Sequence, residues 1–374
     1  MRAEIHRLSM AHPGDVSALA SLLQSRAVHA RSICAIIGKT EGNGGVNDFT
    51  RGYFTDRLMT LLERYLNEPA TMLAKRIPCV LSGGTEGVLS PHYTVLCRVD
   101  ADGPGSIPAL AIGTAFSEPT EHALIGTKAH AQSIAAAVRA AVADAGIEAM
   151  DDVHFVQVKT PCLTSARLAA LQATGVPLKA SSAGQSMARA RAAGAMGVAV
   201  GLGEMNLDAI NDDMMLGDFA AYCSRASISS GVEVDCNEVV VLGNSRRWTG
   251  PLTVAHRPMQ DAIDLDAIHD VLGDLGLPPS RQVGALHRDR IRCVLVKAEP
   301  DRRGAIRGQR HTMLNDIDID PQRHIRGAVG GLVAGVIGDT RIFVSGGAEH
   351  QGPDGGGLIA VIAERAAQQE LTGE

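Results

Sequence analysis

The sequence has few aromatic residues and no surplus of positive charge. Phe, Trp and Tyr make up 3% of its 374 residues, and the formal net charge is −6. Nucleic acid recognition normally uses clustered basic side chains and stacking aromatic rings, so this composition argues against a nucleic acid partner. The chain also has no run of about 18 apolar residues and no signal-peptide core in its first thirty residues. We therefore expect a cytoplasmic protein with no membrane partner.

Cysteine patterns that bind metals are missing as well. The seven cysteines form no C-x-x-C pair and no cluster with histidine, which argues against a structural zinc site. Glycine is abundant instead, with 41 of the 374 residues, or about 11% against an average near 7%. A hydrophobic content of 45% is typical of a globular protein with a large core. The length indicates two or three domains.

Glycine accompanies a short motif that occurs three times. In the stretches 80–87, 227–233 and 343–349, a serine leaves an apolar, strand-like run and is followed by small residues. Small residues at such a place allow backbone N–H groups to approach a ligand closely. A single copy favours an ordinary glycine turn. A ligand-binding role is therefore indicated only by the threefold repetition of the motif.

Each copy of the motif has a lysine and an arginine upstream. The lysine ends an apolar run, and the arginine lies beside small residues between the lysine and the serine. The three sets are Lys39, Arg51 and Ser82; Lys159, Arg191 and Ser229; and Lys297, Arg326 and Ser345. Arg189 competes with Arg191 in the second set, where the Arg-small-small pattern favours Arg191. Three sets in one order favour repeated domains over chance.

The predicted secondary structure repeats in the same way. The order strand, helix, strand, helix, strand, strand occurs three times, which indicates an α+β fold of three similar sheet-plus-helix domains around a pseudo-threefold axis. We place domain A at residues 1–104, domain B at 109–249 and domain C at 251–370. Helices are expected at 16–28 with Asp15 as N-cap, and at 55–66, 127–145, 185–200, 262–275 and 322–337. The serines lie 147 and then 116 residues apart, so the chain is a divergent triplication and not a solenoid.

Three like domains around such an axis would bring their charged sets to one central site. Arginine forks clamp carbonyl or anionic oxygens, so we expect a small, flat, oxygen-rich ligand. A lysine beside a serine also forms a base and a nucleophile, if burial and a nearby positive charge lower the lysine pKa from about 10.4. This predicts amide hydrolysis through an acyl-serine. The residues alone do not choose among the three serines, and the one asymmetry is Ser230, where the other domains have Gly83 and Gly346.

Five longer stretches carry specific motifs, at residues 38–48 (GKTEGNGGVND), 82–92 (SGGTEGVLSPH), 154–159 (HFVQVK), 310–314 (RHTML) and 344–353 (VSGGAEHQGP). Together they span nearly the whole chain and resemble the cyanuric acid amidohydrolase and barbiturase family. The resemblance implies a homotetramer of triplicated chains, each with its active site at the junction of three domains. It also implies hydrolytic opening of the s-triazine ring of cyanuric acid to carboxybiuret, which loses carbon dioxide to give biuret.

The resemblance also assigns roles to single residues. It makes Lys159 the base and Ser229 the nucleophile. The residues expected to bind the substrate, a small planar cyclic imide, are Lys39, Arg51, Ser82, Gly83, Arg191, Ser230, Lys297, Arg326, Ser345 and Gly346. The family also implies a structural divalent cation, magnesium or calcium, on oxygen ligands from Glu299, Ala348, Gln351, Gly352, Pro353 and Gly356. The serine chemistry itself requires no cofactor.

Two other functions stay open. A barbiturase of the same family acts on a pyrimidine ring, in which one carbon replaces one ring nitrogen and few contacts change. A binding protein for small anions would use the same pockets without any chemistry.

Overall fold

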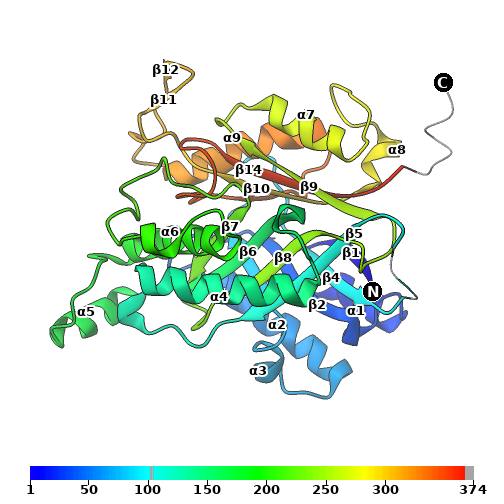
Figure 1. The fold of residues 1–374 in the computed structure, drawn as a ribbon, viewed down its shortest axis with the longest axis horizontal. Helices are drawn as coiled ribbons and strands as arrows, with labels where there is room; N and C mark the ends of the chain where they lie inside the picture. Colours follow the sequence, from blue (N-terminus) through cyan, green and yellow to red (C-terminus); the bar gives the residue numbers. More distant parts are fainter. Residues whose placement is uncertain (102, 104, 367–374) are drawn as a thin grey trace.

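Three small mixed sheets form the framework of the chain (Figure 1). The computed structural model describes residues 1–101, 103 and 105–366. In spatial order, the first sheet contains β1 (Arg2–Ser9), β4 (His92–Val99), β2 (Ile33–Thr40) and β3 (Cys79–Gly83). The second contains β5 (Ala109–Phe116), β8 (Glu238–Ser245), β6 (Val153–Pro161) and β7 (Ala226–Gly231). The third contains β9 (Leu252–Met259), β14 (Gly357–Glu364), β10 (Ile291–Ala298) and β13 (Phe343–Ser345).

The strand pairing is the same in all three sheets. The first two neighbouring pairs are antiparallel, and the last pair, β2 with β3, β6 with β7, or β10 with β13, is parallel. This repetition confirms the predicted α+β fold of three similar domains around a pseudo-threefold axis. The predicted domain ends at residues 104 and 370 lie outside the described residues, and the domain limits stay predictions.

Helices lie beside each sheet (Figure 1). Their bounds in chain order are α1 (Ser17–Gln24), α2 (Phe49–Leu66), α3 (Ala70–Leu73), α4 (Lys128–Ala145), α5 (Ser165–Ala173), α6 (Ala183–Gly201), α7 (Leu265–Asp274), α8 (Ala285–Arg288) and α9 (Pro321–Ile337). A hairpin of β11 (Ala305–Ile306) and β12 (Gln309–Arg310) precedes α9. Short 3-10 turns occupy Ala30–Ser32, His122–Leu124, Met150–Asp152 and Leu207–Ala209.

Two helices in the first domain differ from the sequence expectation. Helix α1 is shorter than the predicted 16–28, because Arg26 takes a left-handed conformation at φ 60° and ends the helical path. Its N-cap is Val16; Asp15 was the wrong choice, although the Asp15 side chain accepts a hydrogen bond from Ser17 N.

Helix α2 begins six residues earlier than the predicted 55–66, because the side chain of Asp48 accepts from Thr50 N and caps it at Phe49. Arg51 therefore lies in the first turn of a helix.

The main hydrophobic core crosses the domain boundaries. Ile37 of β2, Val158 of β6 and Leu295 of β10 belong to one buried cluster, and each is at most 2% exposed. Apolar area removed from water contributes roughly 25 cal/mol per Å², so a shared core holds the sheets against one another. The strands that carry the three lysines are therefore fixed around a common centre.

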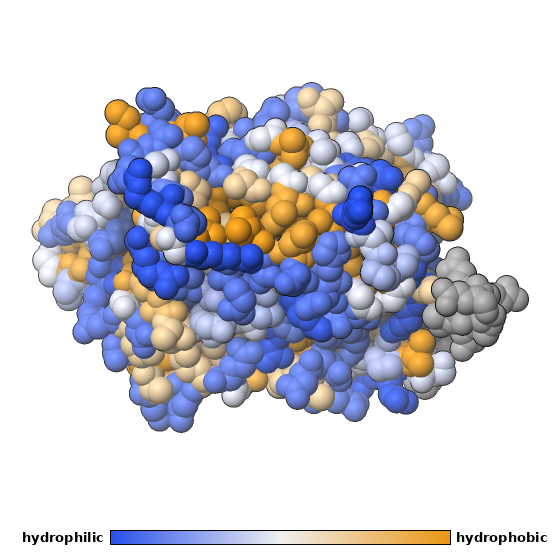
Figure 2. Space-filling view, turned by 90° about the horizontal axis from the view of Figure 1, so that it is seen from above, coloured by the Kyte–Doolittle hydropathy of each residue, from blue (hydrophilic) through white to orange (hydrophobic). Residues whose placement is uncertain are grey.

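The outer surface has both hydrophobic and hydrophilic regions. Seen from above the view of Figure 1, the molecule has a hollowed band of hydrophobic residues between hydrophilic rims (Figure 2). Among the described residues, no helix is both long and apolar enough to cross a bilayer.

Glycine is required where α4 packs on β5. A Cβ on Gly113 would collide with the carbonyl oxygen of Ala141 and meet Ala145 N at 2.8 Å. Overpacking of this kind typically costs 1–3 kcal/mol. We expect Gly113→Ala to lower the free energy of unfolding by about that amount, measured by urea denaturation.

The matched control for this change is Gly273→Ala in α7. A Cβ there meets no atom within 4 Å. Alanine is the better helix former by up to about 1 kcal/mol, so this variant should be neutral or slightly stabilised. Equal destabilisation by the two substitutions would contradict the packing argument.

Candidate active site

The strand pairing brings each lysine beside its serine. Lys39 lies opposite Ser82 in the parallel ladder of β2 and β3, and the same register pairs Lys159 with Ser229 and Lys297 with Ser345. Neighbouring strands are about 4.8 Å apart, so each lysine and its serine start from adjacent backbone positions. The three lysine side chains are at most 1% exposed.

The three arginines come from helices and reach across domain boundaries. Arg51 of α2 bonds Glu233 at 2.6 Å, Arg191 of α6 bonds Glu349 at 2.7 Å, and Arg326 of α9 bonds Glu86 at 2.8 Å, the distances joining Nε to a carboxylate oxygen. Each pair joins the arginine of one domain to the glutamate of the next. The pairs therefore close a ring from A to B, from B to C and from C back to A.

One cavity collects these groups. It has a volume of about 430 Å³ and is lined by all three serines and all three arginines, together with Gly83, Ser230 and Gly346. Ser82 Oγ donates to Ser345 Oγ at 3.2 Å, which shows directly that serines of different domains meet. The lysines are buried behind this lining. We call this space the front cavity.

The three lysine and serine pairs are not equivalent. Lys39 Nζ bonds Ser82 Oγ at 3.1 Å, and Lys297 Nζ bonds Ser345 Oγ at 3.0 Å. Lys159 Nζ instead contacts Glu233 Oε1 at 2.5 Å and Leu81 O at 3.2 Å.

Ser229 Oγ is buried and has no hydrogen-bond partner among the described residues, although Ser229 lines the front cavity. Among the described residues, no protein group therefore forms a hydrogen bond with the Ser229 hydroxyl of domain B.

Burial lowers the pKa of all three lysines. It lowers the pKa of Lys297 to about 7, and the nearby Arg191 adds to the effect. Burial and Arg326 hold the pKa of Lys39 well below its usual value. For Lys159, burial lowers the pKa more than the Glu233 charge raises it. A lowered pKa raises the neutral fraction of a lysine amine, which is the form that accepts a proton.

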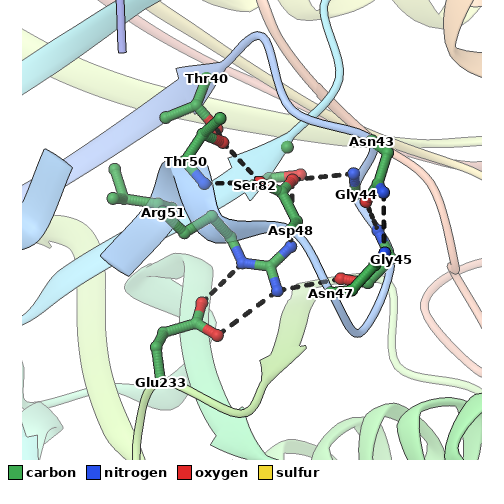
Figure 3. A network of polar contacts seen from close by, with 12 residues as sticks. Thr40, Asn43, Gly44, Gly45, Asn47, Asp48, Thr50, Arg51, Ser82 and Glu233 are labelled. Carbon is green, nitrogen blue, oxygen red and sulfur yellow. Dashed lines mark hydrogen bonds and ion pairs between the residues drawn. The ribbon is translucent and has the colours of Figure 1, made fainter. Parts of the chain in front are cut away.

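The glycine-rich loop before α2 holds Arg51 in place (Figure 3). The Asp48 carboxylate accepts from Gly44 N at 2.8 Å and Thr50 N at 3.0 Å, and it forms an ion pair with Arg51 at 3.3 Å. Arg51 Nη2 also donates to Gly45 O at 3.1 Å. The loop therefore fixes the guanidinium at the edge of the front cavity.

Small residues follow the serines at places where other side chains pack closely against the backbone. A Cβ on Gly83 would collide with Asp48, and one on Gly346 would meet Gln322 Oε1 at 2.7 Å. At the corresponding place in domain B, Ser230 Oγ donates to Met187 O at 3.0 Å and accepts from Arg191 at 3.4 Å. The Ser230 hydroxyl thus ties β7 to α6.

The structure separates the two candidate arginines of α6. Arg191 lines the front cavity. Arg189 points away from it and donates to the carbonyl oxygens of Met215, Gly126 and Asp212. Arg189 therefore has a structural role in holding the segment after α6.

The residues predicted to hold a cation come together only in part. Glu299 accepts from Ala348 N at 2.6 Å, and its own N–H donates to Gly356 O at 3.0 Å. Gly356 N in turn donates to Pro353 O, in the turn that follows Gly352. Gln351 Oε1 accepts from Ile228 N at 2.7 Å, so the amide faces β7. Within the described part of the chain, no three His, Cys, Asp or Glu side chains gather as a metal cluster.

The whole chain matches one protein family. The sequence model described as amidohydrolase ring-opening protein matches residues 4–364. The chain belongs to this family. The amidohydrolase also has close curated relatives. A cyanuric acid amidohydrolase from Azorhizobium caulinodans is 46% identical over 363 residues, which cover 97% of this chain and 98% of that protein. One from Methylobacterium sp. (strain 4-46) is 48% identical over 366 residues, 98% of each.

Solved structures agree with the sequence comparison. A structure of cyanuric acid hydrolase matches the amidohydrolase with a TM-score of 0.92 and 42% identity, and the match covers 97% of this chain and 99% of the other. The cyanuric acid hydrolase from A. caulinodans gives a TM-score of 0.90 at 45% identity, with coverage of 98% and 99%. The amidohydrolase therefore shares both the fold and the length of these enzymes.

Sequence reasoning missed the three glutamates of the ion-pair ring. Glu86, Glu233 and Glu349 each follow a serine of the motif by four residues. This recurrence was the available signal, and it shows that one carboxylate per domain accompanies the Lys, Arg and Ser set.

Glu233 forms ion pairs with two cations, Lys159 and Arg51. Burial raises its pKa, but the charges of Lys159 and Arg51 outweigh burial and lower the pKa to about 2. The ionised carboxylate therefore stabilises the fold above its unfolded pKa of about 4.3, and this stabilisation is lost as pH falls toward 2. We expect Glu233→Gln to reduce stability at about pH 6 on the order of 2 kcal/mol, with a difference from wild type that shrinks toward about pH 3, measured by thermal unfolding.

Glu63→Gln is the control for this measurement, because Glu63 is exposed on α2 and forms no ion pair in the described structure. It should match wild type at every pH. A Glu233→Gln difference that stays constant across the acid range would contradict the proposed charge interaction.

Proposed function

We propose that this amidohydrolase opens the ring of cyanuric acid by hydrolysis and releases carboxybiuret, which loses carbon dioxide to give biuret. The observation that carries the proposal is the convergence of three Lys, Arg and Ser sets on the front cavity. Cyanuric acid alternates three carbonyl and three N–H groups around a flat ring. Its threefold pattern matches the threefold arrangement of guanidinium donors and hydroxyl groups. The names of the curated relatives support the same substrate.

The asymmetry of domain B supports Ser229 as the nucleophile. Its Oγ has no hydrogen-bond partner in the described chain, whereas Ser82 and Ser345 bond each other and their lysines. In the proposed reaction Lys159 turns from Glu233 to Ser229 and accepts the hydroxyl proton. Contacts of this kind often tighten only when substrate is bound.

The proposed reaction has an acylation step and a hydrolysis step. Ser229 Oγ attacks a ring carbonyl carbon while the neutral Lys159 amine takes its proton. The C–N bond breaks, and Lys159 returns the proton to the departing ring nitrogen. Lys159 then removes a proton from water, whose oxygen attacks the acyl-serine carbon. The bond from this carbon to Ser229 Oγ breaks, and Lys159 gives the proton to Oγ, which restores the Ser229 hydroxyl and the neutral amine. Arg51, Arg191 and Arg326 hold the ring oxygens and stabilise the negative charge that develops on them.

Barbiturate is the second candidate substrate, because it keeps the three carbonyl groups of the ring. It replaces one ring nitrogen by carbon and so breaks the alternation that the threefold site matches. A binding role without chemistry would leave the lowered lysine pKa values and the unoccupied Ser229 hydroxyl without a use. These observations favour hydrolysis of cyanuric acid.

Purified enzyme should consume cyanuric acid, followed by ultraviolet absorbance, and should turn over barbiturate far more slowly. Ser229→Ala and Lys159→Ala should lower kcat at least about 10³-fold, because nucleophile and base act as one unit. Both variants should keep the fold, measured by circular dichroism and thermal unfolding.

Ser82→Ala and Ser345→Ala are the matched controls, since each removes the same hydroxyl from another domain. They should mainly raise KM, with a smaller loss of kcat. Wild-type turnover by Ser229→Ala would show that the nucleophile is misassigned. Turnover of neither ring by the wild-type enzyme would leave anion binding as the better explanation.

We also propose a structural magnesium or calcium ion beside Glu299. All the candidate donors are oxygens, which suits these hard cations. Glu299, Ala348 and Gly356 already lie in contact, and the same loop carries Glu349, which pairs with Arg191. When bound, the ion would hold this loop against β10, and the serine chemistry would not involve it.

Chelation provides the test of the cation. Extended treatment with EDTA should lower the melting temperature by several degrees, because anything that binds only the folded state stabilises it. Magnesium or calcium should restore the original value. Loss of activity without any change in melting temperature would argue against a structural role.

The homotetramer and the cytoplasmic location remain proposals that rest on the family resemblance and the composition. The hydrophobic band in Figure 2 offers a surface that a second copy of the chain could bury. Light scattering in solution measures the number of chains.

A further inference from the structure

A second and larger cavity lies behind the catalytic lysine. It has a volume of about 730 Å³ and lies between α2 and α3 of the first domain and the segment from Val232 to Glu238 of the second. We call it the rear cavity. Its lining includes the carboxylates of Asp56, Glu233, Asp235 and Glu238 and the cations Lys75 and Arg167.

The wall between the two cavities is an ion pair. Arg51 lines the front cavity, and its partner Glu233 lines the rear cavity. Figure 3 shows the contact between these two side chains. Lys159 Nζ touches the same Glu233 oxygen at 2.5 Å. The Glu233 carboxylate therefore lies between the Lys159 amine and the rear cavity, whereas the substrate of the proposed reaction lies in the front cavity.

A second carboxylate adjoins Lys159 from the neighbouring strand. Glu238 of β8 lies directly opposite Lys159 of β6, and side chains of such a pair point to the same face of the sheet. Glu238 is 7% exposed, lines the rear cavity and accepts from Cys79 N at 3.0 Å. In the other domains the same register places His92 opposite Lys39 and Leu358 opposite Lys297. Only domain B has a carboxylate at this position.

The proposed reaction needs an outlet for protons. Hydrolysis consumes water, and one of its hydrogens ends on the departing ring nitrogen. The other is released when the carbamic acid product ionises. The front cavity is lined by four arginines against the one carboxylate of Asp320, and their guanidinium groups repel a leaving proton. In the proposed reaction the substrate or product also lies in this cavity. The rear cavity has four carboxylates against two cations in its lining.

We propose that the rear cavity is the route by which water reaches the Lys159 site and protons leave it, with Glu238 as the residue that passes the proton between Lys159 and solvent. This inference rests on the proposed hydrolysis of cyanuric acid. When the carbamic acid product ionises, the neutral Lys159 amine takes its proton and becomes an ammonium group. Lys159 then gives this proton by way of cavity water to the Glu238 carboxylate, which becomes a carboxylic acid. Glu238 then releases the proton to solvent and returns to its ionised form.

The acidities of the two carboxylates suit different tasks. Burial raises the pKa of Glu238 to about 7, against the opposing effects of the Cys79 N–H and Lys159. The charges of Glu233 and Asp235 raise it further, and Cys79 of β3 faces the same carboxylate. Glu233, with a pKa of about 2, stays ionised and serves as a fixed charge. A group that titrates near the working pH transfers protons most efficiently.

The test compares two carboxylates of the same cavity. Glu238→Gln keeps an acceptor for Cys79 N but cannot carry a proton. We expect its kcat for cyanuric acid at about pH 7 to fall at least about tenfold, with KM within about twofold of wild type. Added imidazole, a small proton carrier, should restore part of the lost kcat. Asp56→Asn, an exposed carboxylate in the same lining, should keep kcat within about twofold.

A second pair of variants tests the route without touching a buried group. Thr71 and Met72 are neighbouring exposed residues of α3, and only Thr71 lines the rear cavity. Thr71→Trp should narrow the cavity and lower kcat several-fold, whereas Met72→Trp should leave kcat unchanged. Glu238→Gln with wild-type kcat, or with a loss that imidazole does not relieve, would overturn the inference. Wild-type enzyme that opens neither ring would instead overturn the proposed function.

Discussion

Three ion pairs between domains determine how the rest of the active site is arranged. Arg51, Arg191 and Arg326 come from three helices, and each is held by a glutamate from a different domain. A buried charge without a partner is strongly destabilising, so each pair constrains two domains at once. The parallel strand register places each lysine beside its serine, and this register depends only on the sheet of that domain. Position within a domain is thus set by backbone pairing, and position between domains by the shared hydrophobic core together with the ion pairs.

In the proposed reaction, the site combines threefold recognition of the ligand with chemistry in one domain. All three arginines and all three serines line the front cavity, which suits a ligand of matching symmetry. Only domain B breaks the pattern. Its Ser229 hydroxyl has no hydrogen-bond partner in the described part of the chain, its Lys159 amine is held by Glu233, and Glu238 lies opposite that amine. Two domains with satisfied polar groups can position a ring rigidly. In the proposed reaction, domain B has the groups that transfer protons.

Repetition made much of this structure predictable from sequence. The Lys, Arg and Ser sets stood out because residues with the same chemistry recurred in the same order, and the three-domain α+β fold followed from them. The glutamates were harder to recognise, because a carboxylate after a glycine turn is typical of a solvent-exposed loop. Arg51 and Glu233 are 182 residues apart in the chain, so their contact depends on how whole domains pack.

Local context explains the remaining differences. The start of α2 depends on one side-chain contact from Asp48, at the end of a glycine-rich loop. Glu238 looks in the sequence like an ordinary polar residue at the edge of a strand. Its significance comes from its register opposite Lys159 and from the cavity beyond it, neither of which a linear pattern reveals.

The circular direction of the ion pairs has a consequence for how such a chain can change over time. Every domain supplies a guanidinium to one neighbour and a carboxylate to the other, as subunits do in a cyclic trimer. The ring has no first member, and the covalent order of the three thirds serves only to keep them together. A substitution at the arginine or glutamate of one domain must therefore be matched in the neighbouring domain that carries its partner. A polypeptide with only two of the three domains would leave one arginine and one glutamate exposed to water without their partners.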